Sequence, residues 1–254
     1  MRVVEFLGPP GAGKSTLRRE VIASVEEAGQ SAVDLPTATL AAIRRHGADR
    51  ITRAVAIFAR SSSSAAWRLA YARSADRFAA MTRFLAANPE VMEVVLAAQR
   101  QRQERDLHQV RVLSWIVNLM AATQLVGETA GRSDWLIIDE GFCQRAIALF
   151  GVGFDREDEP WLRFYVAAIP LPEILVVIEA PPSVCEARLD ELGWSERVTG
   201  MSRAERRQFL DTAVRLVQLV ADEAERLGAR VIRVDGTAPI DEFGDALTRV
   251  LIDE

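Results

Sequence analysis

Lysine is almost absent from this sequence. Lysine and arginine together account for 31 of 254 residues, and Lys14 is the only lysine. A lysine ammonium is a compact charge on a flexible stem, which a planar guanidinium does not reproduce. This single exception in an arginine background indicates a function for Lys14 itself.

Cysteines, histidines and long apolar runs are also scarce. The two cysteines supply neither a disulfide framework nor a metal cluster, and the two histidines lack metal-ligand spacing. The longest uncharged apolar stretch, residues 112–127, is shorter than the ~20 residues that span a bilayer, so it predicts a buried helix. Met1 and Arg2 lead into a strand-like run rather than a signal peptide. We expect a cytoplasmic protein without a membrane partner.

Charge is unevenly distributed along the chain. The net charge of -5 does not favour nucleic acid as a partner. Residues 44–111 hold thirteen arginines against six acidic residues, a net of +7, which leaves −12 for the remainder. This basic segment predicts an anionic ligand, although a solvated arginine-rich helical face would have the same composition.

Strand-like and helical patterns alternate. Short β-like runs occur at residues 3–7, 31–35, 135–139, 174–179 and 230–234. The alternation predicts a single α/β domain, residues 1–254, whose parallel sheet has helices on both faces. The segment between the second and third runs is helical in pattern, so residues 40–130 form a predicted insertion. Its large apolar side chains are assigned to the core: Trp67, Trp115 and Met120.

Residues 8–15 match the pattern G-x-x-x-x-G-K-[ST] between a strand-like run and a helical one. Glycines let the backbone wrap around phosphate oxygens, so that N–H groups and the helix N-terminus face the anion. Lys14 would reach the β- and γ-phosphates, and the Ser15 hydroxyl would bind Mg²⁺ together with Asp139, which ends the third run. A strand-end carboxylate satisfied by its neighbours is the alternative for Asp139. ATP and Mg²⁺ are the expected cofactors, bound by Gly8, Gly11, Ala12, Gly13, Lys14, Ser15 and Thr16.

These motifs resemble the thymidylate-kinase and deoxynucleoside-kinase branch of the P-loop kinases. The matching pieces are the glycine loop, Asp34-Leu35-Pro36, Asp139-Glu140-Gly141-Phe142 and the arginine-rich segment after the fourth run. The resemblance implies a three-layer sandwich with a five-stranded parallel sheet, a helical acceptor region between strands two and three, and a lid at residues 188–207. The sequence departs from the family where Asp34 stands two residues before Pro36, and where Gly141 replaces the arginine that typically follows the acid.

Two carboxylates compete for the role of general base towards the acceptor hydroxyl. Asp34 is one candidate, although it would serve equally as a cap for the following helix or turn. Glu140 is the other. Four side chains are expected to contact the acceptor, although Arg145 would equally suit a surface position: Arg73, Arg77, Phe142 and Arg145.

Arginines after the fourth run would stabilise charge on the transferred phosphoryl group. The candidates are Arg188 and Arg197. Ser202, followed by a glutamate three residues later, reads as a capping box, so the arginines at 203–207 would decorate a helix instead. By the resemblance, the loop after the last strand borders the adenine through Gly236, Thr237 and Ala238.

Together these features predict a kinase that transfers the γ-phosphoryl group of ATP to a small molecule, such as a nucleoside, a nucleotide or a sugar-like hydroxyl compound. An ATP-hydrolysing enzyme or switch is the first alternative, because an acid at this position also activates water. A nucleotide-binding interaction protein without turnover is the second. The sequence leaves a homodimer open.

Substitution of the lone lysine tests this interpretation. Lys14→Ala should abolish turnover and Lys14→Arg should lose most of it, because the guanidinium cannot reproduce the ammonium geometry. Initial rates of ADP formation at saturating ATP measure both effects. Near wild-type activity in Lys14→Arg would contradict the argument from lysine geometry.

Overall fold

Five parallel strands form one sheet in the order β2-β3-β1-β4-β5. The strands are β1 (Arg2–Leu7), β2 (Ala32–Asp34), β3 (Trp135–Ile138), β4 (Ile174–Glu179) and β5 (Arg230–Asp235). The computed structural model describes residues 1–100, 106–129, 133–195, 198, 200–238, 247, 250 and 251. All of β3 and most of β4 are buried, as expected for apolar strands covered on both faces. The predicted five-stranded parallel sheet is confirmed.

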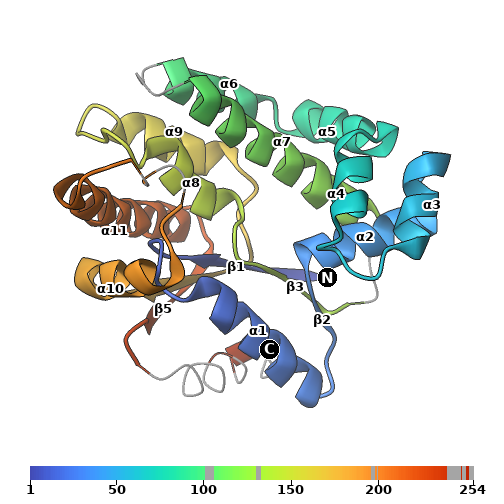
Figure 1. Ribbon diagram of the computed structural model, residues 1–254, viewed down its shortest axis with the longest axis horizontal. Helices are drawn as coiled ribbons and strands as arrows, with labels where there is room; N and C mark the ends of the chain where they lie inside the picture. Colours follow the sequence, from blue (N-terminus) through green and yellow to red (C-terminus); the bar gives the residue numbers. More distant parts are fainter. Residues whose placement is uncertain are drawn as a thin grey trace.

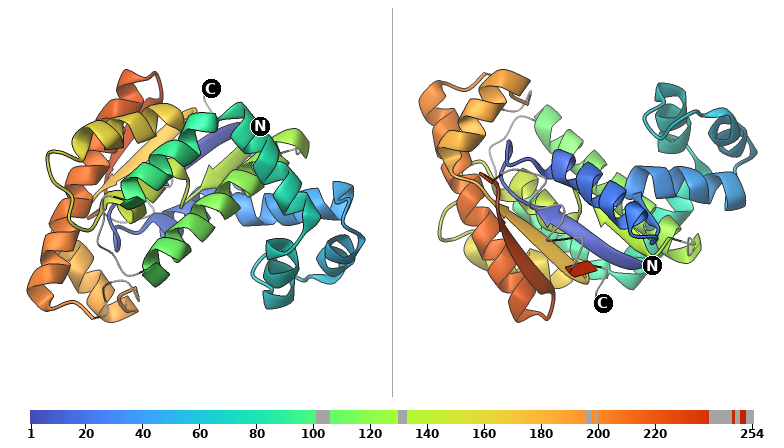
Figure 2. Two further views of the ribbon diagram at one scale, coloured as in Figure 1. Left: turned by 90° about the horizontal axis from the view of Figure 1, so that it is seen from above. Right: turned by 90° about the horizontal axis from the view of Figure 1, so that it is seen from below.

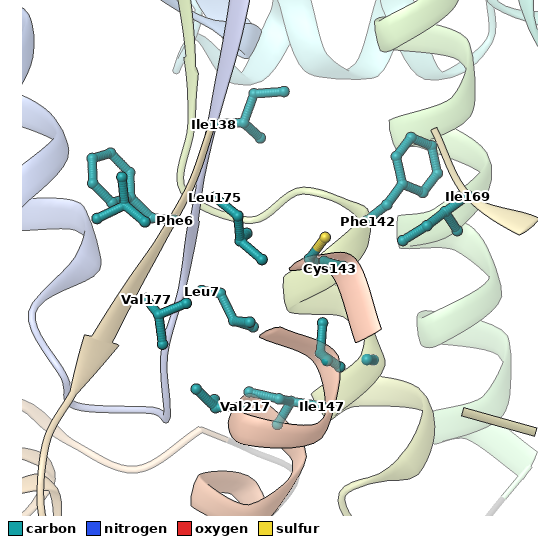
Figure 3. Close-up of a cluster of buried hydrophobic side chains, with 14 of the residues drawn as sticks. Phe6, Leu7, Ile138, Phe142, Cys143, Ile147, Ile169, Leu175, Val177 and Val217 are labelled. Atoms are coloured by element: carbon teal, nitrogen blue, oxygen red, sulfur yellow. The ribbon is translucent and has the colours of Figure 1, made fainter. Parts of the chain in front are cut away.

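Helices cover both faces of the sheet (Figure 1). One face carries α1 (Lys14–Glu27), and the other carries α8 (Phe142–Phe150) and α11 (Arg203–Arg226), with α9 (Glu159–Ala168) outside α8. Helix α10 (Pro182–Leu192) follows β4. Figure 3 shows Leu7 and Val177 of the sheet near Ile147 of α8 and Val217 of α11, in the main core. The sequence also predicts a helix after the loop at residues 236–239, and that segment falls largely outside the described residues.

The predicted helical insertion lies between β2 and β3. It comprises α2 (Leu35–His46), α3 (Arg50–Phe58), α4 (Ala65–Ala72), α5 (Ala75–Ala87), α6 (Pro89–Arg100) and α7 (Asp106–Thr129). Helices α3 and α4 project beyond the edge strand β2 (Figures 1 and 2). Helix α7 packs against α2 and α5, with Ile116 and Met120 fully buried. Its residues Gln109–Thr129 are long and apolar enough to cross a membrane by length and composition alone, and 44% of the most apolar window is buried within the protein. The predicted helix is therefore present, but it is only partly buried.

One predicted helix is divided. The pattern at residues 65–87 favours a continuous helix, but the structure has a break at Arg73 and Ser74. The Ser74 hydroxyl accepts a hydrogen bond from the backbone N–H of Arg77 at 3.0 Å, so it caps α5 as a new helix. The cap formed by Ser74 therefore sets the boundary between α4 and α5.

A buried carboxyl group on β1 caps α8. Glu5 is 2% exposed, and its Oε1 accepts a hydrogen bond from the backbone N–H of Gln144 at 2.9 Å. The residue at the cap position of α8, Gly141, has no side chain to offer, so Glu5 fills that role from another element. A Cβ on Gly141 would lie 2.4 Å from Glu5 Cδ. This close approach favours a residue without a Cβ at position 141.

Glu5→Gln should remove a pH dependence of stability. Burial raises the pKa of Glu5 from 4.5 to about 7, against the N–H donors of α8 that lower it. Between pH 4.5 and about 7, Glu5 therefore keeps its proton in the folded state, whereas it has lost that proton in the unfolded state. The resulting contribution to the free energy of unfolding is fully present below 4.5 and is lost as pH rises through 7.

As pH rises through this window, the free energy of unfolding of the wild type should fall by up to about 3 kcal/mol. Urea unfolding on both sides of this pH window should show it in the wild type, and the difference from Glu5→Gln isolates the contribution of this one carboxyl group. The same pH dependence in both proteins would place the titrating group elsewhere.

Candidate functional site

The glycine loop forms the wall of a cavity at the start of α1. Gly11 and Gly13 have φ angles of 81° and 101°, which side-chain-bearing residues rarely adopt. A Cβ on Gly11 would lie 2.7 Å from the backbone oxygen of Cys185, so α10 packs directly against the loop. The cavity measures about 410 Å³, and Ala12, Lys14, Ser15 and Thr16 are among its lining residues.

Lys14 is held by the backbone of its own loop. Its Nζ donates hydrogen bonds to the carbonyl oxygens of Gly8 at 2.8 Å and Pro9 at 3.0 Å. Burial lowers the pKa of Lys14 to about 8, while the nearby carboxylates of Glu140 and Asp139 act in the opposite direction. The only ammonium side chain of the protein thus lies beside two carboxylates in the cavity wall.

Ser15 and Asp139 meet as the sequence predicts. The Ser15 hydroxyl donates a hydrogen bond to Asp139 Oδ2 at 3.0 Å. No group of three or more His, Cys, Asp or Glu side chains suited to a metal occurs among the described residues. One hydroxyl and one carboxylate fit Mg²⁺, because this ion takes few protein ligands and completes its shell with phosphate oxygens and water.

Arg18 joins three elements at this edge and was not identified from the sequence. Its Nη1 lies 3.4 Å from Asp139 Oδ1 and 3.2 Å from Asp34 Oδ2, so α1 is tied to the ends of β3 and β2. Arg18 follows Lys14 by four residues and therefore shares its helix face. That spacing was the signal that could have revealed it.

Asp34 is engaged through both of its carboxylate oxygens. Oδ1 accepts a hydrogen bond from the backbone N–H of Thr37 at 2.8 Å, and Oδ2 pairs with Arg18. The cap that the sequence leaves open for Asp34 is confirmed. The role of Asp34 as a general base stays a prediction. Asp34 lines neither the loop cavity nor the second cavity, on the far side of Glu140.

A second cavity, of about 450 Å³, separates the strand ends from the helical insertion. Its walls contain the aromatic side chains Trp67, Tyr71 and Trp115. Glu140 lines this cavity and also the loop cavity, so it stands where the two adjoin.

Arg145 lies beside Glu140 in the second cavity, a placement consistent with the predicted contact. Its Nη2 donates a hydrogen bond to Glu140 Oε2 at 2.8 Å, and its guanidinium lies 5.2 Å from the centre of the Trp115 ring. The assignment of Trp115 to the core is wrong, because this side chain is 39% exposed and lines the cavity. Hydrophobicity alone could not separate a cavity wall from a core position.

Three other predicted acceptor residues do not line the second cavity. Arg73 is exposed at the end of α4, and Arg77 binds Asn118 instead of facing the cavity. Phe142 is buried in the core (Figure 3). Its ring stacks on that of Phe84. Among the described residues of the basic segment, Arg68 is the arginine that lines this cavity. Helical phase, which the pattern did not resolve in this segment, decides which arginine points inward.

Arg188 connects the glycine loop to the segment after β5. Its Nη2 donates a hydrogen bond to the carbonyl oxygen of Gly236 at 2.9 Å. Its Nη1 donates to the carbonyl oxygens of Gly11 at 3.4 Å and Ala12 at 3.3 Å. Gly236 and Ala238 line the loop cavity, as expected for that segment. Thr237 instead donates its hydroxyl to Asp235, 2.6 Å away, and lines a neighbouring cavity.

The remaining arginines of the predicted lid segment lie after α10. Arg197 lies outside the described residues. The capping box of Ser202 is confirmed, and Arg203 and Arg207 pair with Glu186 at 2.9 Å and 3.3 Å. These two side chains therefore join α11 to α10, as the helix-decoration alternative expects.

Gln144 is a further residue that the sequence did not reveal. Its side-chain Oε1 accepts a hydrogen bond from the backbone N–H of Gly8 at 3.0 Å, while its backbone N–H donates to Glu5. Helix α8 is thereby fixed to the first residue of the glycine loop. The contact joins positions 136 residues apart, which no local pattern records.

Comparisons with known proteins support the fold. No protein-family model and no curated protein matches the chain. Among solved structures, deoxyadenosine kinase from M. mycoides with bound dATP matches over 98% of both chains, at 13% identity and a TM-score of 0.51. The same enzyme with dCMP and dCDP as products matches over 99% of this chain and 100% of its own, at 13% identity and a TM-score of 0.50. The chain thus has the fold of the P-loop deoxynucleoside kinases, as the resemblance predicts.

Proposed function

We propose that this protein is an ATP-dependent kinase that phosphorylates a hydroxyl group of a nucleoside-like small molecule. The observation that carries the proposal is the position of Glu140, which lines both the glycine-loop cavity and the aromatic cavity. A carboxylate between the two cavities can accept the proton of an acceptor hydroxyl bound in the aromatic cavity. The hydroxyl oxygen can then attack the γ-phosphorus of ATP bound in the glycine-loop cavity.

Each residue around Glu140 has a defined part in this scheme. Lys14 exchanges its loop carbonyl partners for phosphate oxygens, and the N–H groups of the loop bind the remaining oxygens. Ser15 and Asp139 would hold Mg²⁺, which neutralises charge on the phosphates when bound. Arg145 orients Glu140 through their hydrogen bond.

The transfer balances without a further reactant. The acceptor oxygen forms a bond to the γ-phosphorus as the bond from that phosphorus to the bridging oxygen of ADP breaks. The hydroxyl proton passes to Glu140, which releases it to solvent after the product leaves. Catalysis is mainly positioning and charge stabilisation.

The aromatic walls support a planar acceptor. Trp67 and Tyr71 stack with their ring centres 5.3 Å apart, and Trp115 faces the same cavity. Rings of this kind bind the flat face of a heterocycle by stacking. The M. mycoides enzyme of the same fold is a deoxyadenosine kinase, which agrees with a nucleoside-like acceptor.

ATP hydrolysis without an acceptor is the alternative function, and the second cavity argues against it. Water needs no chamber of about 450 Å³ lined by three aromatic side chains. A kinase must also limit attack by water before its acceptor arrives.

An acceptor screen tests the proposed function. Nucleosides, nucleotides, sugars and aminoglycoside-like compounds are added to the protein with ATP and Mg²⁺, and ADP is measured. One class should accelerate ADP formation at least ~10²-fold, the low end expected for a positioned base, with the phosphate found covalently on the product. Rapid release of free phosphate that no acceptor accelerates would support the hydrolase instead.

A matched pair of amide substitutions identifies the base. Glu140→Gln keeps an acceptor for Arg145 but cannot take a proton, so kcat should fall by ~10²–10⁴ while ATP binding is retained. Asp34→Asn keeps the helix cap, because asparagine and aspartate cap equally well, and should leave most of the activity. Kinetics of phosphoryl transfer and equilibrium binding of ATP measure both. The reverse result would assign the base to Asp34.

A further inference from the structure

Arg77 determines which atom of Asn118 faces the second cavity. Arg77 Nε donates a hydrogen bond to Asn118 Oδ1 at 2.6 Å. A guanidinium has only donors, so the amide oxygen must be the atom turned towards it. Asn118 lines the cavity, and its Nδ2 forms no hydrogen bond with any described residue. The side chain therefore offers N–H donors to a ligand.

Tyr71 also lines this cavity, and its side chain ends in a second unpaired polar group. Its hydroxyl is buried and has no hydrogen-bond partner among the described residues, although the ring stacks on Trp67. Burial raises the pKa of Tyr71 well above its ordinary value, so the hydroxyl keeps its proton and can donate it.

The polar groups differ between the two sides of the cavity. At the strand ends, Asp139 and Glu140 accept hydrogen bonds, and Arg145 donates one to Glu140. On the α4 and α7 wall, Asn118 offers N–H donors and the Arg68 guanidinium adds only donors.

We propose that Asn118, held by Arg77, selects acceptor molecules whose planar ring presents lone pairs, as an unprotonated ring nitrogen or carbonyl oxygen does. Arg77 is then a positioning residue, which acts on the ligand through Asn118. The inference rests on the proposed function for the meaning of the cavity, and it adds the chemistry by which the acceptor is chosen.

Ligands that differ in one ring atom test the proposal. Adenosine, guanosine and cytidine are compared with deaza analogues, in which C–H replaces one ring nitrogen without adding a donor. Equilibrium binding is followed through tryptophan fluorescence, since Trp67 and Trp115 line the cavity, and requires neither ATP nor turnover. At least one replacement should weaken binding to the wild type by about 10–100-fold, because it leaves a donor unpaired.

Asn118→Asp is the decisive variant. The carboxylate keeps the contact with Arg77 and the shape of the side chain, but it faces the cavity with an acceptor instead of a donor. The deaza replacement that weakens binding to the wild type should therefore cost nothing in Asn118→Asp.

Arg77→Met and Arg83→Met separate positioning from general stability. Arg83 also joins α5 to α7, through a pair with Glu128, but it does not line the cavity. Arg77→Met frees the amide to rotate, so the ratio of affinities for parent and deaza ligand should approach one. Arg83→Met should keep the wild-type ratio. Because each ratio is taken within one protein, a loss of stability does not change it.

The outcomes distinguish the inference from the proposed function. Phosphoryl transfer to an acceptor, with deaza effects that are absent or equal in wild type and Asn118→Asp, would overturn the inference alone. Deaza effects that depend on Asn118 and Arg77, without any transfer, would support the inference and contradict the kinase. If none of the parent nucleosides binds, both are overturned.

Discussion

Parallel pairing on both sides of β1 is the constraint on which the whole site depends. Strand β1 lies between β3 and β4, in a register that pairs Glu5 with Ile138 and Leu7 with Val177. The carboxyl ends of these strands therefore share one edge of the sheet, where ligands of such folds bind. The glycine loop and the acidic pair, which lie more than a hundred residues apart in the sequence, meet at that edge.

The helical insertion forms most of the second cavity's wall and also fixes part of that wall from outside. Helix α7 supplies Trp115 and Asn118 to the wall, while α5 supplies Arg77, which fixes one of them from outside. A similar indirect support occurs at α8, where Glu5 holds the helix start. Buried polar groups with fixed partners thus set the orientation of the groups that face the cavities.

The sequence predicted those features that depend on local pattern. The glycine loop, the strands, the meeting of Ser15 with Asp139 and the Ser202 capping box belong to this group. Arg18, Gln144 and the cap provided by Glu5 could not be predicted, because each contact joins distant parts of the chain. The acceptor arginines were misplaced because an arginine-rich helical segment has no clear phase, and only packing turns Arg68 towards the cavity.

The lone lysine also simplifies the amine chemistry of the protein. Burial lowers the pKa of Lys14 to about 8, so this amine gives up its proton more readily than an exposed lysine does, and the neutral amine is the form that acylating reagents attack. Such reagents meet a single ε-amine in the whole chain, and it lies in the wall of the loop cavity. Lysine acetylation, which removes the positive charge of the side chain, therefore has a single site in this protein, and that site is the residue proposed to bind phosphate.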